Sequence, residues 1–250
     1  MVPTSPFYDE IGRSYAATRQ EDPRIAAQIQ RALGAGGSVL NVGAGTGNYE
    51  PVGGTVVALD ASVRMLAQRT KRSPLVVRGV AERLPFPDGA FRAALAVFTV
   101  QHWNDRHAGL RELRRVSHRQ VIVFHQPTET RRLWMLDYFE EVSPRPTDQR
   151  EPDDDVLRAC LQVREVQTVL VPHDCVDGFG AAFWARPEAY LDPAVQAGIS
   201  ELASLPDQAR ARWTARLAAD LESGEWDRRH GDLRTMTAYD AGYRLAIAES

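Results

Sequence analysis

A glycine-rich turn stands between two short apolar runs, and an acid closes the second run. The first run covers residues 39–42, the turn 43–47 has glycine at alternate positions, and the second run, 55–59, leads into Asp60. Glycine permits positive φ and lets a ligand lie directly against the backbone. A carboxylate at the end of the second strand can accept hydrogen bonds from both hydroxyls of a ribose. The pattern therefore predicts a site for a cofactor that contains adenosine.

The spacing of the glycines distinguishes between two such cofactors. Dinucleotides bind to G-x-G-x-x-G, with the pyrophosphate at a helix N-terminus, whereas this chain has the shorter G-x-G-x-G. Glu50 would place a negative charge beside the phosphates, and Pro51 would restrict the start of a helix. Both features favour S-adenosylmethionine, whose tail is a zwitterionic amino acid, over NAD. The alternatives are an NAD-dependent oxidoreductase and a non-catalytic module that binds an adenosyl group or regulates a partner.

Segments further along the chain occur in the order typical of one enzyme family. Residues 57–66 run from a predicted strand through an acid into a predicted helix, and residues 81–91 read Ala-Glu-Arg-Leu-Pro-Phe-Pro-Asp-Gly-Ala-Phe. An apolar run at 93–99 precedes a His-Trp pair, and residues 111–116 read Arg-Glu-Leu-Arg-Arg-Val. Together with the glycine turn, these segments resemble the class I S-adenosylmethionine-dependent methyltransferases of type 11, the ubiquinone/menaquinone methyltransferase-like family. The resemblance covers residues 39–125.

The resemblance assigns cofactor roles to residues in each segment. The glycines of the turn would cradle S-adenosylmethionine, Asp60 would hold its ribose, and the Ala-Glu pair at 81–82 would border its adenine. An N-terminal Y-A-x-x-R element would close on the methionine end. The complete set is Tyr15, Arg19, Gly43, Ala44, Gly45, Gly47, Asp60, Ala61, Met65, Ala81, Glu82, Phe98 and Thr99. The chain departs from the family pattern at Asn41, where an acid is usual, and at Val80, where an aspartate often meets the adenine.

Two histidines are candidates for a general base. Methyl transfer from a sulfonium is an in-line displacement, in which the enzyme aligns the acceptor, excludes water and, for some acceptors, takes a proton. His102 follows the predicted fourth strand and His125 ends the fifth, so both stand at the carboxyl edge of the sheet, where ligands bind. We therefore consider His102 first and His125 second. The alternative for His102 is packing beside Trp103, and the alternative for His125 is a hydrogen-bonded structural role.

A cluster of residue types that bind metals, at 173–177, gives little support for a metal site. It contains histidine, aspartate and cysteine, which are common zinc ligands. Adjacent side chains point in different directions, and the sequence offers no second pair of ligands. We therefore expect no metal.

Aromatic residues are candidates for contact with a methyl acceptor. They are spread over the N-terminal segment and the predicted insertions, where they could cover an apolar or aromatic small molecule. The four candidates are Tyr8, Trp103, Trp134 and Trp184. Packing in the protein core is the alternative role for such side chains.

The bulk composition limits the classes of partner. The chain has 250 residues with 30 basic and 33 acidic side chains, and it lacks the long basic run that would indicate nucleic-acid binding. No apolar run reaches the roughly 18 residues of a membrane span. The N-terminus lacks the features of a signal peptide, and the two cysteines form no disulfide framework. These features predict a cytoplasmic protein that acts on a small molecule, with the oligomeric state, monomer or homodimer, left open.

Apolar runs that alternate with helical patterns predict an α/β fold with a doubly wound parallel sheet. The predicted strands are 38–42, 55–60, 74–79, 92–99, 120–125, 167–171 and 243–247. Predicted helices lie at 62–71 and 105–117, and the apolar residues Ile25, Ile29 and Leu33 recur at helical spacing after Pro23. The resemblance implies a Rossmann-like sheet of seven strands in the order 3-2-1-4-5-7-6, with the last strand antiparallel.

We expect a single methyltransferase domain over the whole chain. Its parts would be an N-terminal helical cap (1–35), a cofactor-binding core (36–126) and a remainder (127–250) with the last strands and helical insertions. The insertions would form a lid over the acceptor. Within them, residues Ala209, Trp213, Leu217 and Leu221 recur at helical spacing, which predicts a helix that faces the core.

Overall fold

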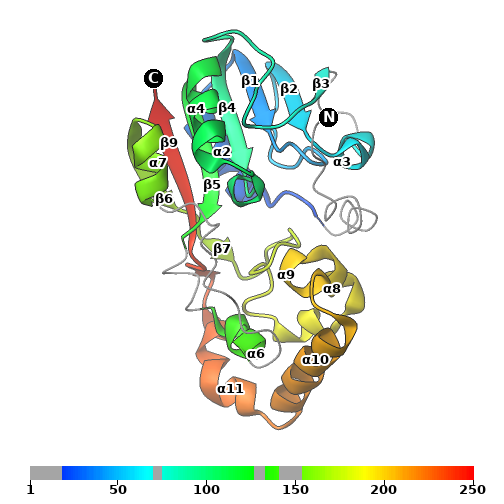
Figure 1. Cartoon of the computed structure of the whole chain (residues 1–250). Coiled ribbons are helices and arrows are strands. Elements are labelled where there is room, and N and C mark those ends of the chain that lie inside the picture. Colours follow the sequence, from blue (N-terminus) through cyan, green and yellow to red (C-terminus); the bar gives the residue numbers. More distant parts are fainter. Residues whose placement is uncertain (1–18, 70–74, 127–132, 141–153) are drawn as a thin grey trace.

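The structure is a computed structural model that describes residues 19–69, 75–126, 133–140 and 154–250. A seven-stranded sheet with its covering helices makes up one half, and a largely helical part lies beyond one end of the strands (Figure 1). The strands of the sheet are β1 (Ser38–Val42), β2 (Thr55–Asp60), β3 (Leu75–Arg78), β4 (Phe91–Val97), β5 (Ser117–His125), β6 (Val163–Thr168) and β9 (Tyr243–Glu249).

The order of the strands is β3-β2-β1-β4-β5-β9-β6. The first five strands run parallel, and β9 is antiparallel to both β5 and β6. With β9 counted as the seventh strand, this confirms the predicted order and the antiparallel last strand. The predicted strand 167–171 was wrong in its bounds, because β6 begins at Val163. As an edge strand, β6 is partly exposed and lacks the continuous apolar run that marks a central strand.

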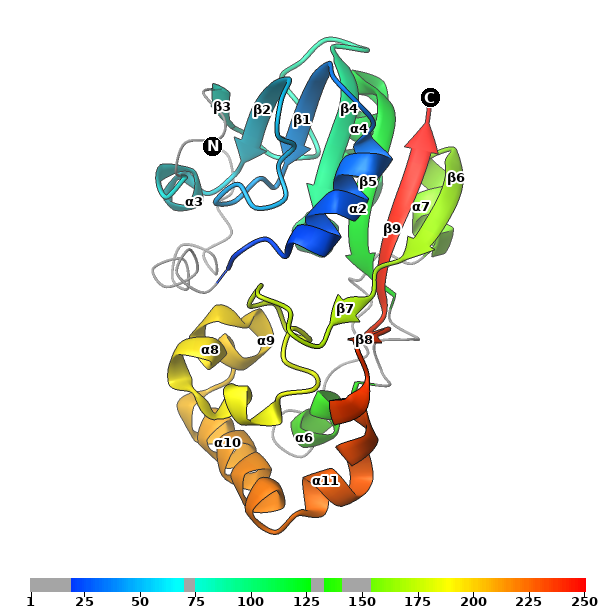
Figure 2. The ribbon, with the colours of Figure 1, turned by 180° about the vertical axis from the view of Figure 1, so that it is seen from behind.

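Helices cover both faces of the sheet (Figure 2). On one face, α2 buries the predicted stripe of Ile25, Ile29 and Leu33 against the sheet, and Asp22 caps its N-terminus. On the other face, α4 and α7 bury Leu110, Leu113 and Leu157. The helices around the sheet are α2 (Pro23–Leu33), α3 (Val63–Ala67), η1 (Val100–His102), α4 (Arg106–Val116) and α7 (Asp154–Cys160).

The connection from β1 to β2 is unusual for parallel strands. Parallel neighbours are ordinarily joined by a crossover that contains an α-helix. Here residues 43–54 make the crossover as turns and bends, with no helix in this fully described segment. The predicted alternation of strands and helices therefore fails at this point. The side of the glycine turn that a crossover helix would cover must be supported in some other way.

The helical part, residues 133–140 and 173–237, has an aromatic core of its own. Its helices are η2 (Trp134–Leu136), α6 (Asp137–Glu140), η3 (Pro187–Leu191), α8 (Pro193–Gly198), α9 (Ser200–Ala203), α10 (Asp207–Glu222), α11 (Glu225–His230) and η4 (Gly231–Thr235). A short ladder of β7 (Val171–Pro172) with β8 (Ala238–Tyr239) joins it to the sheet. The predicted stripe on α10 is confirmed, since Ala209, Trp213 and Leu217 are buried in this core.

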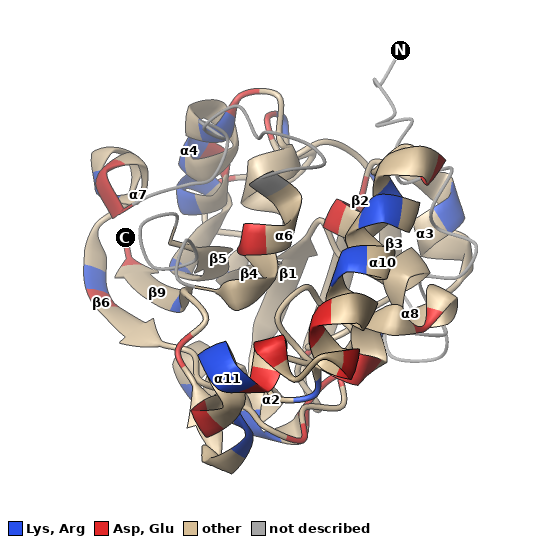
Figure 3. Ribbon diagram, turned by 90° about the horizontal axis from the view of Figure 1, so that it is seen from below, with Lys and Arg blue, Asp and Glu red and all other residues tan. Residues whose placement is uncertain are grey.

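The surface of the helical part carries mixed charge. Basic and acidic residues lie close together on α10 and α11 in the view from below (Figure 3). Pairs such as Arg210–Asp207 and Arg228–Glu225 lie on successive turns of these helices. No helix in the described part of the chain is both long and apolar enough to cross a membrane.

Replacement of Trp213 by alanine should destabilise the fold strongly. Trp213 lies on α10, and its fully buried side chain packs against α6 and η3, so truncation leaves a large cavity. We expect Trp213→Ala to lower the free energy of unfolding by about 3–5 kcal/mol in urea denaturation. Arg212→Ala, on the exposed side of the same helix, serves as the control and should change it by less than about 0.5 kcal/mol. Equal, small effects of both changes would contradict this packing.

Candidate functional site

The glycine turn lies at the carboxyl edge of the sheet and packs tightly against the end of β4. Gly43 has φ 68°, and a Cβ there would lie 1.9 Å from Oγ1 of Thr99. The backbone N–H groups of Gly43 and Ala44 both donate to the carbonyl of Leu59, at 2.9 and 3.0 Å. Only glycine allows this close approach at position 43. The predicted cofactor residues of the turn and of 98–99 are thus brought together.

Asp60 fixes the turn from the side of the predicted cofactor. Its Oδ2 accepts from N–H of Gly45 at 2.8 Å, and its Oδ1 accepts from N–H of Ser62 at 2.8 Å. Ser62 in turn caps α3, the helix that places Met65 beneath Gly45. Burial raises the pKa of Asp60, and the hydrogen bonds from Ser62 and Gly45 oppose that rise. The carboxylate is partly exposed at the sheet edge, with Ala61 beside it.

The predicted adenine segment lies next to Asp60. The N–H of Gly79 donates to the carbonyl of Asp60 at 3.1 Å, which joins the start of this segment to the end of β2. Ala81 is buried, and Oε1 of Glu82 accepts from N–H of Asn104 at 2.7 Å and of Asp105 at 3.2 Å. Glu82 therefore ties the segment to the start of α4. A role of these residues in adenine binding stays a prediction.

A buried ion pair supports the other side of the turn. Both carboxylate oxygens of Glu50 accept from Nη2 of Arg69 at 2.6 Å, and the two side chains are 0% and 6% exposed. The amide of Asn41 donates to Oε1 of Glu50 at 2.9 Å. An acid at position 41 would set two carboxylates against each other, which explains why this chain has asparagine there.

A second buried network joins Tyr49, which follows the glycine turn, to the N-terminal segment and to the helical part. The hydroxyl of Tyr49 donates to Oδ2 of Asp177 at 2.6 Å, and Nε of Arg19 donates to Oδ1 at 2.7 Å. Burial, with the charge of Asp177, raises the pKa of Tyr49, so its hydroxyl stays protonated as the donor. Tyr49 adopts φ 64°, a strained value for a non-glycine residue. Asp177 belongs to the helical part, so this contact couples that part to the turn.

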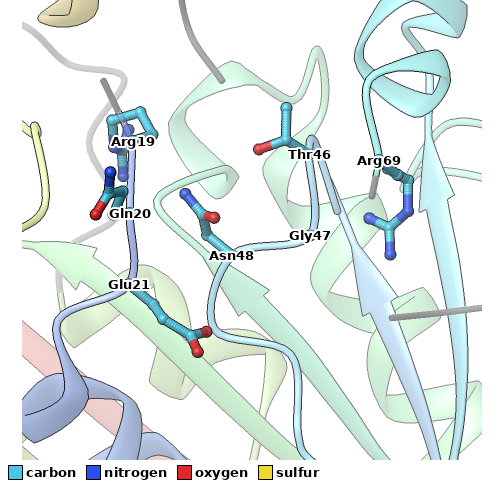
Figure 4. Close-up of a pocket in the computed structure, with 7 residues that line it drawn as sticks. All are labelled: Arg19, Gln20, Glu21, Thr46, Gly47, Asn48 and Arg69. Atoms are coloured by element: carbon cyan, nitrogen blue, oxygen red, sulfur yellow. The ribbon is translucent and has the colours of Figure 1, made fainter. Parts of the chain in front are cut away.

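A cavity of about 310 Å³ lies between the glycine turn and the N-terminal segment (Figure 4). It is lined by Arg19, Gln20, Glu21, Thr46, Gly47, Asn48 and Arg69. Its volume falls at the lower end of the range for small-molecule sites, roughly 300–1,000 Å³. Two guanidinium groups and one carboxylate border it, which suits a zwitterionic group. The predicted neighbourhood of Arg19 and the turn is therefore present, while Tyr15 lies outside the described residues.

The two candidate bases occupy different surroundings. His102 ends η1 and is exposed, next to Trp103. His125 ends β5, and its ring contacts those of Tyr243 and Phe98, with centroids 4.5 and 5.4 Å apart. Phe98 adopts φ 50°, an unusual conformation for an aromatic residue, at the predicted inner wall of the cofactor site. Both histidines lie at the carboxyl edge, and a catalytic role for either stays a prediction.

Packing accounts for three of the predicted acceptor contacts. Trp134 and Trp184 are buried, and their indole N–H groups donate to the carbonyls of Trp184 and Val171 at 2.8 and 3.0 Å. Trp103 packs on α4, where a Cβ on Gly109 would lie 2.4 Å from its ring. Tyr8 lies outside the described residues. Contact of these side chains with an acceptor stays a prediction.

The residues at 173–177 are engaged in separate contacts. Asp174 pairs with Arg24 at 2.6 Å, Cys175 is buried, and Asp177 belongs to the network described above. Nδ1 of His173 lies 3.3 Å from the carbonyl of Thr237. No group of three metal-binding side chains occurs among the residues that the structure describes.

Several residues of the site were not predicted. They are Tyr49, Arg69, Asp177, Phe179 and Tyr243. Phe179 and Tyr243 complete an aromatic cluster with Phe98, from segments far apart in the sequence. No local signal marks Arg69 as the partner of Glu50, because it lies 19 residues further along the chain, beyond β2 and α3.

Relatives of this chain include methyltransferases. Residues 40–124 match a family model for a methyltransferase domain of type 11. A demethylmenaquinone methyltransferase of Mycolicibacterium vanbaalenii is 37% identical over 147 residues, which cover 54% of this chain and 64% of that protein. The chain thus spans less than two thirds of the length of this curated relative.

Solved structures extend the likeness to the helical part. A methyltransferase from an antibiotic biosynthesis pathway of Anabaena variabilis is 30% identical with a TM-score of 0.81, over 93% of this chain and 99% of the other. The [4+2]-cyclase SpnF shares the fold, with a TM-score of 0.55 and 16% identity, over 100% of this chain and 97% of the other.

The fold and the glycine turn define a class I methyltransferase. The chain belongs to the type 11 family of these S-adenosylmethionine-dependent enzymes. The family and its cofactor, S-adenosylmethionine, are therefore as the sequence predicted.

Asp60 is predicted to accept the ribose hydroxyls as a carboxylate. As the pH is lowered, protonation of Asp60 should reduce the affinity for S-adenosylhomocysteine. Because the pKa of Asp60 is raised, we expect this loss of affinity to begin at a higher pH than it would for an ordinary aspartate. Asp60→Asn should weaken binding by about 1–3 kcal/mol and remove this pH dependence in calorimetric titrations. Asp207→Asn, at an exposed position on α10, is the control. The same pH profile in Asp60→Asn and the wild type would contradict the assignment.

Proposed function

We propose that this chain transfers a methyl group from S-adenosylmethionine to a small-molecule acceptor at the carboxyl edge of its sheet. The observation that supports this most is the convergence of four segments: the glycine turn, Asp60, the end of β4 at Phe98–Thr99 and the N-terminal segment at Arg19. Each of them was expected, on the basis of sequence, to contact one portion of the same cofactor. The residues present fit that cofactor in charge and in space.

The chain's own groups would hold the cofactor by its two polar ends. Asp60, partly exposed beside the turn, offers carboxylate oxygens to a ribose. The cavity beside the turn would place an amino acid tail between the guanidinium of Arg19 and the carboxylate of Glu21. When bound, the cofactor supplies an activated methyl group on a sulfonium with its own good leaving group.

The remaining work of the protein is alignment, exclusion of water and, for some acceptors, removal of a proton. Alignment of an acceptor can contribute roughly 7–11 kcal/mol to lowering a barrier. His102 and His125 stand at the same edge as the turn, and either could take a proton from an acceptor hydroxyl. The helical part lies beyond this edge and would cover the acceptor (Figure 1).

An aromatic or specialised metabolite is the acceptor class that we favour. Phe98, His125, Phe179 and Tyr243 form a cluster of rings with centroids 4.5–5.7 Å apart at the ends of β4, β5 and β9. Phe98 and His125 are only partly buried, so they offer apolar ring surface to a ligand. The Anabaena relative, which matches along both parts of the chain, belongs to an antibiotic biosynthesis pathway, whereas the demethylmenaquinone enzyme matches over only about half of this chain.

Two alternatives make different predictions. An NAD-dependent oxidoreductase requires space for a pyrophosphate at a helix N-terminus, and the crossover 43–54 has no helix. A non-catalytic adenosyl-binding module would bind the cofactor without transferring its methyl group. The fold by itself does not decide between these outcomes, since SpnF has the same fold and is a cyclase.

Binding of the product cofactor tests the proposal first. We expect S-adenosylhomocysteine to bind in calorimetry and to raise the melting temperature by mass action, while NADH does neither. Detection of a methylated product from a panel of phenolic, amine and carbon acceptors then separates an enzyme from a binding module. Binding of NADH without binding of S-adenosylhomocysteine would overturn the assignment.

The role of His102 is tested by turnover. If His102 takes a proton from the acceptor, His102→Gln should lower turnover by roughly 10²–10⁴-fold and leave the affinity for S-adenosylhomocysteine nearly unchanged. His125→Gln should cost less. His107→Gln, which alters an exposed histidine on the nearby α4, is the control and should keep full turnover. Full turnover of His102→Gln would leave the reaction to alignment alone.

A further inference from the structure

The glycine turn of this chain is supported by a side chain in place of a helix. In a crossover with a helix, the carbonyls of the first turn accept hydrogen bonds from amides four residues later. The crossover 43–54 contains no such helix. Nη1 of Arg69 donates instead to the carbonyls of Ala44 and Gly45, at 3.3 and 3.2 Å. The guanidinium group thus supplies donors to the segment that a helix would otherwise satisfy.

Arg69 is itself fixed in place by two buried partners. Glu50, at the far end of the turn, accepts from Nη2 through both of its oxygens, and Asn41, on β1, donates to Glu50. A charge-assisted pair of this geometry is stronger and more directional than a neutral hydrogen bond. Arg69 can therefore hold one conformation of the turn.

Both backbone polar groups of Gly45 are hydrogen-bonded to side chains. Its N–H donates to Asp60, the predicted ribose acid, and its carbonyl accepts from Arg69. Gly45 has φ 51°, and a Cβ on Gly47 would lie 3.2 Å from the guanidinium of Arg69. Arg69 and Asp60 stand on either side of the short helix α3, so one helix positions both contacts.

We propose that Arg69, fixed by Glu50 and Asn41, is a positioning residue that holds the glycine turn in the shape that binds the cofactor. The inference rests on the proposed function, because it concerns affinity for the same cofactor. It assigns a cofactor-related role to three residues that do not themselves need to touch the cofactor.

The test compares the affinity for S-adenosylhomocysteine among variants of the full chain. Removal of both charges in Arg69→Ala/Glu50→Gln avoids an unpaired buried carboxylate and should weaken binding by about 10- to 100-fold. Arg69→Lys keeps the charge but not the forked donors, so it should weaken binding less. Arg114→Ala, which removes an exposed arginine from α4, is the control and should leave the affinity unchanged.

An exchange of the two polar partners distinguishes positioning from general stability. Asn41→Asp places a carboxylate 2.9 Å from that of Glu50 and should weaken binding by about tenfold or more. Addition of Glu50→Gln relieves the repulsion but removes the carboxylate that holds Arg69, so it should recover only part of the lost affinity. Recovery of the full wild-type affinity, with both variants folded, would show that Arg69 does not need this partner and would overturn the proposal.

Hydrogen exchange without cofactor keeps this test separate from that of the proposed function. Amides of residues 43–50 should exchange faster in Arg69→Ala/Glu50→Gln than in the wild type, while those of β5 stay protected. Unchanged exchange or unchanged affinity in that variant overturns the role of Arg69. If the wild-type chain fails to bind S-adenosylhomocysteine, the proposed function and the role of Arg69 in affinity are both overturned. Hydrogen exchange of the amides of residues 43–50 still shows in that case whether Arg69 holds the turn.

Discussion

The buried charge of Glu50 is the constraint on which the structure depends at the carboxyl edge of the sheet. A carboxylate with no exposed surface is costly unless a cation and hydrogen-bond donors surround it. Arg69 and Asn41 meet that requirement. The buried charge therefore requires a donor near the end of β1, where Asn41 lies, and a cation after α3, where Arg69 lies. The crossover can then be short and free of helix. The glycine turn keeps its shape because it is bounded by Asp60 on one side and by Arg69 on the other.

A second buried charge connects this edge to the rest of the molecule. Asp177 belongs to the helical part, and it receives hydrogen bonds from Arg19 and from Tyr49, which follows the glycine turn. Removal of either donor would weaken the hydrogen bonding of this buried carboxylate, to which the N–H of Gly178 also donates. The network makes the position of the helical part and the conformation of the turn depend on each other. A ligand that alters one therefore has a physical route to the other.

The division of the molecule into a sheet and a helical part separates most of the predicted cofactor residues from the helices. The predicted cofactor residues between 43 and 99 belong to the sheet half, where the family model matches residues 40–124. The helical part has its own aromatic core, in which Trp134, Trp184 and Trp213 are buried. Such a core allows this part to keep a fixed surface toward the sheet edge. The fold is compatible with more than one chemistry, so the reaction must be decided at the edge where the two parts meet.

The sequence alone determined the stripes of α2 and α10 and the residues of the glycine turn, because each depends on local periodicity or on glycine spacing. The order of the strands depends on pairing between distant segments, and it was predicted only from the resemblance to the type 11 family. Pro51 indicated that a helix would not start readily in the crossover, but nothing in the sequence indicated that β6 begins at Val163, because edge strands have weak local signals. The partners of Glu50 and Asp177 were decided by tertiary structure only. Arg69 and Arg19 lie far from them in sequence, and a buried charge selects its partner by position in space.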